Sequence, residues 1–431
     1  MTFWRFCVLA TAVVIAGCSS SASPKISSSQ QRGPLNGPQH GIIKHVVIII
    51  QENRTVDNLF NGYPGIDTAQ SGLDSQGNTV QLVKRPLFQP GGPNHDHTAF
   101  ESAYDNGKMD RFDKVQNGRG IPDLSYSYTD PTDVAPYWQM AQKYVIGDRM
   151  FQSNSGPSFP AHQYLIASQS PWADENPTGA PWGCDAPQGT TVNALNSQGQ
   201  EYVYGFPCFD YQTIADELDG AGISWRYYTP LSEGVWSAFD AIKHIRYGPD
   251  WNTDIASFNA YTPAKDFARG DMADVTWVVP AGFNSDHPNQ VGDHGPQWVS
   301  SLVNAIGNGP DWDSTAIFVV WDDWGGWYDH VAPTQLDVFG LGLRVPLLVI
   351  SPYDRQGYIS HVDHEFGSIM RFTEETFNLQ TLAASDARAD DLLDCFDFSQ
   401  SPQPFKPITG VQAPPQYHGT SILSDIAPDD E

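Results

Sequence analysis

Five short apolar runs divide the chain and constrain its fold more than any other feature. Each run is continuous rather than alternating, which is typical of strands buried on both faces of a sheet. The runs cover residues 45–50, 224–228, 276–280, 316–321 and 345–351. Patterns with helical spacing lie between them, at residues 211–218, where Gly220 is expected to end the helix, 298–306 and 365–377. The alternation predicts an α/β fold with a mostly parallel central sheet flanked by helices.

One catalytic-size domain, residues 43–398, is the simplest account of this pattern. Within it, residues 152–210 are rich in Gly, Pro, Ser and Trp and indicate a long, loop-rich, cross-linked insertion. Cys184 and Cys208 lie in that insertion and are the favoured disulfide pair, which leaves Cys395 as a buried thiol, although spacing alone does not fix the pairing. Residues 399–431 form a polar, Pro-rich tail, expected to be an extended strap or disordered rather than a domain.

The N-terminus has the form of a secretory signal. In residues 1–17, Arg5 precedes an apolar run that is too short to span a bilayer as a stable helix. The run ends in Ile15-Ala16-Gly17-Cys18, which resembles a bacterial lipobox; ordinary cleavage nearby is the alternative. Residues 18–42 suit a flexible tether. These features predict an exported protein, in the cell envelope or secreted, whose one membrane attachment is a lipid at Cys18.

The charge balance excludes several partners. The chain has 23 Lys and Arg against 50 Asp and Glu, a net charge of −27. It therefore offers no basic face for nucleic-acid phosphates or for an anionic lipid surface. A phosphate-binding site in this chain must neutralise its ligand with something other than a patch of Lys and Arg.

Polar side chains follow two of the predicted strands. Glu52 and Asn53 come after the first run, and Asp322 and Asp323 come after the run at 316–321. Open α/β sheets place their sites beyond the carboxyl ends of strands, and neighbouring carboxylates repel unless a cation or proton lies between them. Such oxygen ligands suit Ca²⁺, Mg²⁺ or Mn²⁺. Alternatively, Glu52 and Asn53 cap a following helix, and the two aspartates form a solvated turn.

Ser158 and several histidines are further candidates. Ser158 is placed to cap a helix with Pro160 in its first turn; beside a metal, the same position would activate the hydroxyl as a nucleophile and hold a phosphate. The histidines in polar, Gly- or Pro-flanked contexts can bind phosphoryl oxygens and protonate a leaving group, or can equally be surface residues. They are His95, His97, His287, His294 and His330.

Seven segments, in order, resemble the bacterial phosphoesterase family that includes acid phosphatases and phospholipases C. They span about residues 43–380 and are Ile43–Phe60, His95, Gly107–Asp110, Ser155–Ser158, Ser285–Pro288, Trp321–His330 and Arg344–Pro352. The resemblance implies a fold similar to alkaline phosphatase, with one metal at the carboxyl edge of the sheet and a serine nucleophile.

Carried over residue by residue, the resemblance implies metal ligands at Glu52, Asn53, Asp322, Asp323 and Ser158, with Ser158 also the nucleophile. The metal is one divalent ion, Ca, Mg, Mn or Zn.

The resemblance also implies phosphate-binding and proton-transfer roles for His95, His287 and His330. Spacing back from Asp110 favours His95, and His97 is left as its alternative. Asn53 would also contact substrate, and His162 receives no role.

The resulting hypothesis is an exported, metal-dependent phosphoric ester hydrolase that forms a phosphoserine and acts on small phosphate esters, as acid phosphatases do. A phospholipase C is the alternative; the longer phospholipases of the family carry additional C-terminal domains, whereas about 50 residues follow the matching region here. From another class, a non-catalytic solute- or carbohydrate-binding lipoprotein would account for the 13 Trp and the tether.

Overall fold

The computed structural model describes residues 37–230, 236–257, 263–288, 294–382 and 384–410, together with Met1. The expected signal, the lipidation site at Cys18 and nearly all of the tether lie outside the described residues, as does the end of the tail. Among the described helices, none has the length and apolar character needed to cross a membrane.

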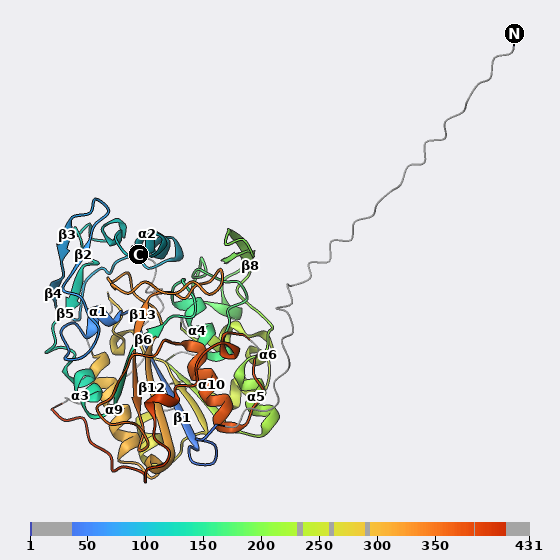
Figure 1. The fold of residues 1–431 in the computed structure, drawn as a ribbon. Coiled ribbons are helices and arrows are strands. Elements are labelled where there is room, and N and C mark those ends of the chain that lie inside the picture. The colour runs from blue at the N-terminus through green and yellow to red at the C-terminus, as the bar shows by residue number, and fades with distance from the viewer. Residues whose placement is uncertain (2–36, 231–235, 258–262, 289–293, 383, 411–431) are drawn as a thin grey trace.

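A nine-stranded sheet forms the centre of the described residues (Figure 1), with the strand order β10-β9-β11-β1-β12-β13-β6-β14 and with β15 also pairing with β6. Its strands are β1 (His45–Gln51), β6 (Val145–Phe151), β9 (Trp225–Thr229), β10 (Ile255–Ser257), β11 (Val275–Val278), β12 (Thr315–Trp321), β13 (Arg344–Ile350), β14 (Ile359–Ser360) and β15 (His364–Glu365). Only β13 runs antiparallel to its described neighbours, β12 and β6. The α/β fold with a mostly parallel sheet is confirmed.

The five apolar runs become β9, β11 and the three strands at the middle of the sheet, β1, β12 and β13. Every residue of β12 and β13 is buried, as is every residue of β1 after His45. Continuous apolar sequence therefore marks the strands that are covered on both faces.

Helices cover both faces of the sheet. The α-helices of the described residues are α1 (Val56–Leu59), α2 (His97–Tyr104), α3 (Ala135–Lys143), α4 (Ser158–Ala167), α5 (Ile214–Ala221), α6 (Lys243–Arg246), α7 (Asp250–Thr253), α8 (Pro263–Arg269), α9 (Gly295–Gly307) and α10 (Phe366–Phe377). Helix α9 packs against α3 and α8, whereas α4 packs against α5 and α10 on the other side of the sheet (Figure 1).

The predicted end of the first helix is wrong. Helix α5 begins after Thr213, whose side chain forms a capping box with Asp216, and it continues through Gly220. It ends at Gly222, which has φ 69° and donates its N–H to the carbonyls of Leu218 and Asp219. Either Gly220 or Gly222 could end a helix as judged from the sequence, but the left-handed backbone that favours glycine occurs at Gly222.

Three two-stranded sheets lie outside the central one: β2 (Ser71–Leu73) with β3 (Thr79–Gln81), β4 (Val83–Arg85) with β5 (Ser127–Thr129), and β7 (Val192–Leu195) with β8 (Glu201–Gly205). The last is a hairpin in the insertion at residues 152–210, which also contains the buried helix α4.

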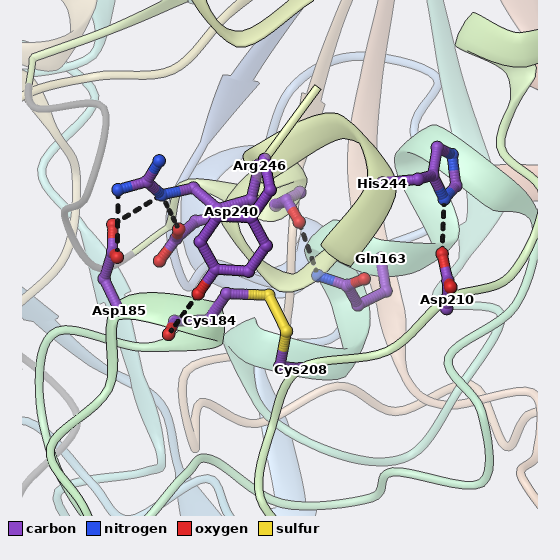
Figure 2. Close-up of a disulfide and its surroundings, with 10 residues drawn as sticks. Gln163, Cys184, Asp185, Cys208, Asp210, Asp240, His244 and Arg246 are labelled. Atoms are coloured by element: carbon purple, nitrogen blue, oxygen red, sulfur yellow. Dashed lines mark hydrogen bonds and ion pairs between the residues drawn. A yellow bond between two sulfur atoms is a disulfide. The ribbon is translucent and has the colours of Figure 1, made fainter.

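The expected disulfide between Cys184 and Cys208 is present in the insertion, and Cys395 is a buried free thiol. Figure 2 shows the bridge beside Arg246, which holds Asp185 through two bonds of 2.7 and 3.0 Å, and near Gln163 of α4. The bridge thus joins two segments that lie 24 residues apart in the sequence, and it does so close to α4.

Removing the bridge is expected to destabilise the fold. For a loop of this length, the loss of chain constraint in the Cys184→Ser/Cys208→Ser variant lowers the free energy of unfolding by about 3 kcal/mol. Denaturant titration measures the change, and reduction of the unsubstituted protein supplies the control. An unchanged midpoint in both cases would contradict the expectation.

The described part of the tail, residues 399–410, is an extended strap without helix or strand. Its Phe405 stacks on Tyr144 and lies edge-on to Trp312, while the backbone of Lys406 exchanges hydrogen bonds with the hydroxyl of Tyr144. The strap of the sequence prediction is therefore present as far as Gly410.

Candidate active site

Two parallel strands bring the predicted carboxylates together. Strands β1 and β12 pair in register up to Gln51 and Trp321, so the residues that follow each strand emerge side by side. These residues are Glu52, Asn53, Asp322 and Asp323, and all four are fully buried.

Backbone hydrogen bonds fix one oxygen of each aspartate. Asp322 Oδ1 accepts the N–H of Asn53 at 3.0 Å and that of Asp323 at 2.7 Å, and Asp323 Oδ1 accepts the N–H of Gly325 at 2.7 Å. The two loops touch so closely that a Cβ at Gly325 would lie 2.2 Å from the carbonyl oxygen of Asn53. The second oxygen of each aspartate is thereby left to face the interior of the cluster.

Ser158 faces these carboxylates from α4. Its hydroxyl lies 3.1 Å from Asp323 Oδ2 and 3.5 Å from Glu52 Oε2, and the side chain is fully buried. Pro157 is the N-cap residue, so Ser158 is the first residue of the helix, one position later than a cap. The backbone N–H of the next residue, Phe159, donates to Asn176 Oδ1 at 2.9 Å, which fixes the start of the helix.

His162 completes the cluster. Its Nε2 lies 3.1 Å from Glu52 Oε1 and 3.4 Å from Asp322 Oδ2, and the ring is buried. No role was expected for His162 from the sequence. The signal was its spacing of four residues from Ser158, which places both side chains on one face of a helix.

The chemistry of these donors fits a divalent cation. Ligand atoms of Glu52, His162 and Asp322 all lie within 4.8 Å of one another. Asn53 Oδ1 is buried without a hydrogen-bond partner, which is costly unless a further group binds it. Burial alone would raise the pKa of Asp322, but hydrogen bonds with His162, Glu52 and Ser158 outweigh it and hold that pKa below its ordinary value. The carboxylate is therefore kept in the charged form that binds metal.

Two of the predicted histidines adjoin this cluster. His95 Nδ1 lies 3.1 Å from the carbonyl oxygen of Pro93, which can only accept, so Nδ1 carries the proton of the neutral ring. Nε2 is then the acceptor, and it accepts from the side-chain amide of Asn53 at 2.8 Å. The ring of His287 lies 5.8 Å from that of His95, centroid to centroid, and 5.9 Å from Trp236. Both rings thus stand on the Asn53 side of the carboxylates.

The structure places His97 elsewhere. Its Nδ1 lies 2.9 Å from Ser155 Oγ, and its Nε2 lies 3.7 Å from the exposed carboxylate of Glu101. Burial lowers its pKa. The contact with Asn53 therefore favours His95 over His97, although their catalytic roles stay predictions.

His330 belongs to a second cluster. Its Nδ1 lies 2.7 Å from Asp57 Oδ2 and its Nε2 lies 3.1 Å from Asp67 Oδ1, so both ring nitrogens face carboxylates other than those around Ser158. Arg344 joins the cluster through paired bonds of 2.8 and 3.0 Å to Asp329. These contacts hold the β12–β13 connection on α1, and a role for His330 in proton transfer stays a prediction.

The His330 contacts predict a pH-dependent contribution to stability. Burial opposes its protonation, but the carboxylates of Asp57 and Asp329 outweigh it and raise the pKa of His330. A raised histidine pKa adds stability that is complete below the unfolded pKa and is lost as the pH rises through the folded pKa. His330→Gln should therefore lower the melting temperature more at about pH 5.5 than at about pH 9. His40→Gln, at an exposed ring bonded to a backbone carbonyl, is the control; equal losses at both pH values would contradict the expectation.

Residues 43–380 match the phosphoesterase family. The chain belongs to this family. The phosphoesterase is 26% identical over 474 residues to phospholipase C B of Mycobacterium tuberculosis, with 94% of this chain and 88% of that protein covered. It is 25% identical over 459 residues to the non-hemolytic phospholipase C of Burkholderia pseudomallei, covering 86% of this chain and 62% of that protein. A Vibrio parahaemolyticus protein of the alkaline phosphatase superfamily shows a TM-score of 0.41 and 11% identity, over 83% of this chain and 72% of its own. This phosphoesterase is a hydrolase that acts on phosphoester bonds.

Proposed function

We propose that this phosphoesterase cleaves phosphodiesters in the manner of a phospholipase C, through a phosphoserine at Ser158. The observation that carries the proposal is the Ser158 hydroxyl, hydrogen-bonded to Asp323 in a buried cluster of carboxylates at the start of α4. A hydroxyl held there is positioned for in-line attack on a phosphorus atom, and the helix N-terminus favours the charge of the phosphoryl group.

The cation would be held by Glu52, Asn53, Asp322, Asp323 and Ser158, with His162 added to the predicted ligands. When bound, a divalent cation lowers the pKa of the attacking hydroxyl and neutralises charge on the phosphoryl oxygens. Carboxylates alone suit Ca²⁺, Mg²⁺ or Mn²⁺, whereas the imidazole of His162 favours Mn²⁺ or Zn²⁺.

The proposed reaction has two chemical steps, in which a carboxylate and His287 move the protons and His95 positions Asn53. Ser158 Oγ forms the bond to phosphorus as its proton passes to a neighbouring carboxylate, and the bond to the leaving oxygen breaks. His287, beside His95, donates the proton that the leaving oxygen needs, while His95 holds Asn53 in position through its Nε2. Water then cleaves the phosphoserine and restores the hydroxyl.

Chain length does not argue against a phospholipase C. The sequence analysis favoured an acid phosphatase because a short tail follows the matching region. However, the chain covers 88% of the length of phospholipase C B of Mycobacterium tuberculosis, so an enzyme with that name needs little additional sequence. Both sequence relatives named above are phospholipases C, which supports a diester over a monoester substrate.

Parallel assays distinguish the candidates. Purified protein with each of Ca²⁺, Mg²⁺, Mn²⁺ and Zn²⁺ is given p-nitrophenyl phosphorylcholine and p-nitrophenyl phosphate across a pH series. We expect faster release of nitrophenol from the diester. A preference for the monoester would favour the acid phosphatase, and no turnover of either substrate with any metal would favour the non-catalytic binding lipoprotein.

Export is part of the proposal. The signal-like residues 1–17 and the lipobox-like sequence ending at Cys18 support an envelope or secreted location. Mass spectrometry of the N-terminal peptide from the native host tests it, because a diacylglyceryl group on Cys18 is expected. An unmodified N-terminus from cleavage at a nearby residue would contradict the lipid anchor, and retention of residues 1–17 in the mature protein would contradict export.

A further inference from the structure

The β7–β8 hairpin exposes large apolar side chains. Tyr202, Val203, Tyr204 and Phe206 are 43%, 62%, 44% and 42% exposed, within five consecutive positions. The first four residues of β8 are all exposed, so both faces of this strand meet solvent instead of packing on the protein. A concentration of exposed aromatic and aliphatic side chains on a single strand is unusual for a soluble surface and is typical of an interaction site.

The hairpin is firmly joined to the helix that carries Ser158. Aromatic rings follow one another from Tyr202 to Tyr204, Phe209 and Phe159, with centroid separations of 6.5, 5.5 and 6.1 Å. Phe159 directly follows Ser158 in α4. Figure 1 shows the hairpin projecting at the end of the molecule toward which β1 and β12 direct their carboxyl ends.

The base of the hairpin is held by two links. One link lies along β7, where Ala194 forms a bridge with Ala173; the other is at the base, where Cys208, a few residues beyond β8, is joined to Cys184. A two-stranded hairpin alone is marginally stable in water, so these links allow it to keep its apolar surface exposed.

The charge of the hairpin differs from that of the whole chain. Residues 191–209 contain one charged residue, Glu201, in a protein whose net charge is −27. At the base, burial raises the pKa of Glu175 to about 9 and that of Asp174 to about 7, which reduces the negative charge there near neutral pH. The segment has no Lys or Arg to attract anionic lipids, and it has few charged groups that would lose hydration on contact with a neutral lipid surface.

We propose that the β7–β8 hairpin docks the enzyme on a zwitterionic phospholipid bilayer. Tyrosine favours the membrane interface, where its ring is buried and its hydroxyl meets the head groups, and phenylalanine and valine add apolar area that the acyl region can bury. Docking through this strand sets the bilayer against the end of the molecule toward which β1 and β12 direct their carboxyl ends, the end at which Ser158 and the carboxylates lie. This inference rests on the proposed phospholipase C function, since it names the physical form of the substrate that reaches the same site.

Vesicle binding tests the proposal separately from catalysis. The variant Tyr202→Ser/Val203→Ser/Phe206→Ser removes three exposed apolar side chains and keeps Tyr204, which packs on Phe209. We expect the unsubstituted protein to co-sediment with phosphatidylcholine vesicles and the triple variant to bind them about tenfold more weakly. Hydrolysis of soluble p-nitrophenyl phosphorylcholine should be unchanged, while hydrolysis of phosphatidylcholine in vesicles falls with binding.

Three controls keep the outcomes distinct. Ser158→Ala should bind vesicles as the unsubstituted protein does, so loss of catalysis and loss of docking are separable. Tyr247→Ser/Val362→Ser removes exposed apolar side chains outside the hairpin and should leave binding unchanged. Vesicles containing phosphatidylserine should bind more weakly at low salt than phosphatidylcholine vesicles do.

Equal vesicle binding by the unsubstituted protein and the triple variant would overturn the proposal. So would a change of oligomeric state in the triple variant, measured by light scattering, without a change in vesicle binding, because the hairpin would then contact a second copy of the chain. Vesicle binding without any ester hydrolysis would instead retain the docking surface and remove the proposed function.

Discussion

Replacing Ser158 with alanine is expected to reduce turnover by about 10⁴-fold or more while the protein remains folded. The hydroxyl is the attacking group of the proposed reaction, and its neighbours Asp323 and Glu52 cannot supply an equivalent nucleophile at the start of α4. Steady-state assay of p-nitrophenyl phosphorylcholine measures the loss. Acid quenching of the unsubstituted protein during turnover should also trap a phosphorylated peptide containing Ser158, which the variant lacks.

The matched control is Ser155→Ala, three residues earlier in the same buried segment. Its hydroxyl contacts His97 and lies outside the carboxylate cluster, so its loss should reduce turnover by less than about tenfold. Similar, large losses in both variants would point to disturbance of the segment, and full activity of Ser158→Ala would remove Ser158 as the nucleophile.

Removing the metal is expected to abolish activity and to lower stability together. Without a cation, three fully buried carboxylates, those of Glu52, Asp322 and Asp323, repel one another. A free metal concentration about a hundredfold above its dissociation constant should add about 3 kcal/mol to the apparent free energy of unfolding. Thermal unfolding and activity are measured after chelation and dialysis, and again after each metal is restored.

A pair of histidine variants tests which residues bind the metal. His162→Gln should weaken metal binding by at least about tenfold, because the ring faces both Glu52 and Asp322. His97→Gln should leave the affinity unchanged, since that ring contacts Ser155 and Glu101 instead. Equal metal affinity in all three proteins would exclude His162 as a ligand, and full stability after verified metal removal would contradict the proposed site.

The parts of the fold that sequence could predict are those set by local pattern. Continuous apolar runs located β1, β12 and β13 to within one residue, because the inner positions of strands covered on both faces are apolar. The runs do not encode strand direction, so the antiparallel course of β13 became evident only from its register with β12 and β6. Similarly, Gly220 and Gly222 offer the same composition signal, and α5 ends at the one with the left-handed backbone, Gly222, which composition does not specify.

In the candidate site, too, the residues marked by local sequence could be predicted, whereas those that depend on contacts between distant segments could not. Glu52, Asn53, Asp322 and Asp323 were found because each pair directly follows a buried strand, and the parallel pairing of β1 with β12 joins them. His162 received no role because relatives in the resembling family often carry another polar residue at that place, and its spacing from Ser158 has meaning only once α4 faces the carboxylates. His330 has the polar context expected of a catalytic group, yet its contacts with Asp57 and Asp67 depend on segments distant in sequence.

The reversal of direction at β13 has a consequence for how this enzyme can be altered. Because β12 and β13 are antiparallel neighbours, the connection between them, residues 322–343, begins and ends at the same edge of the sheet. A connection between parallel neighbours would have to cross a face of the sheet and return. Specificity could therefore be redesigned by exchanging the distal part of this loop, beyond the cluster of Asp329 and His330, with loops of other lengths, while the strands and metal ligands stay in place.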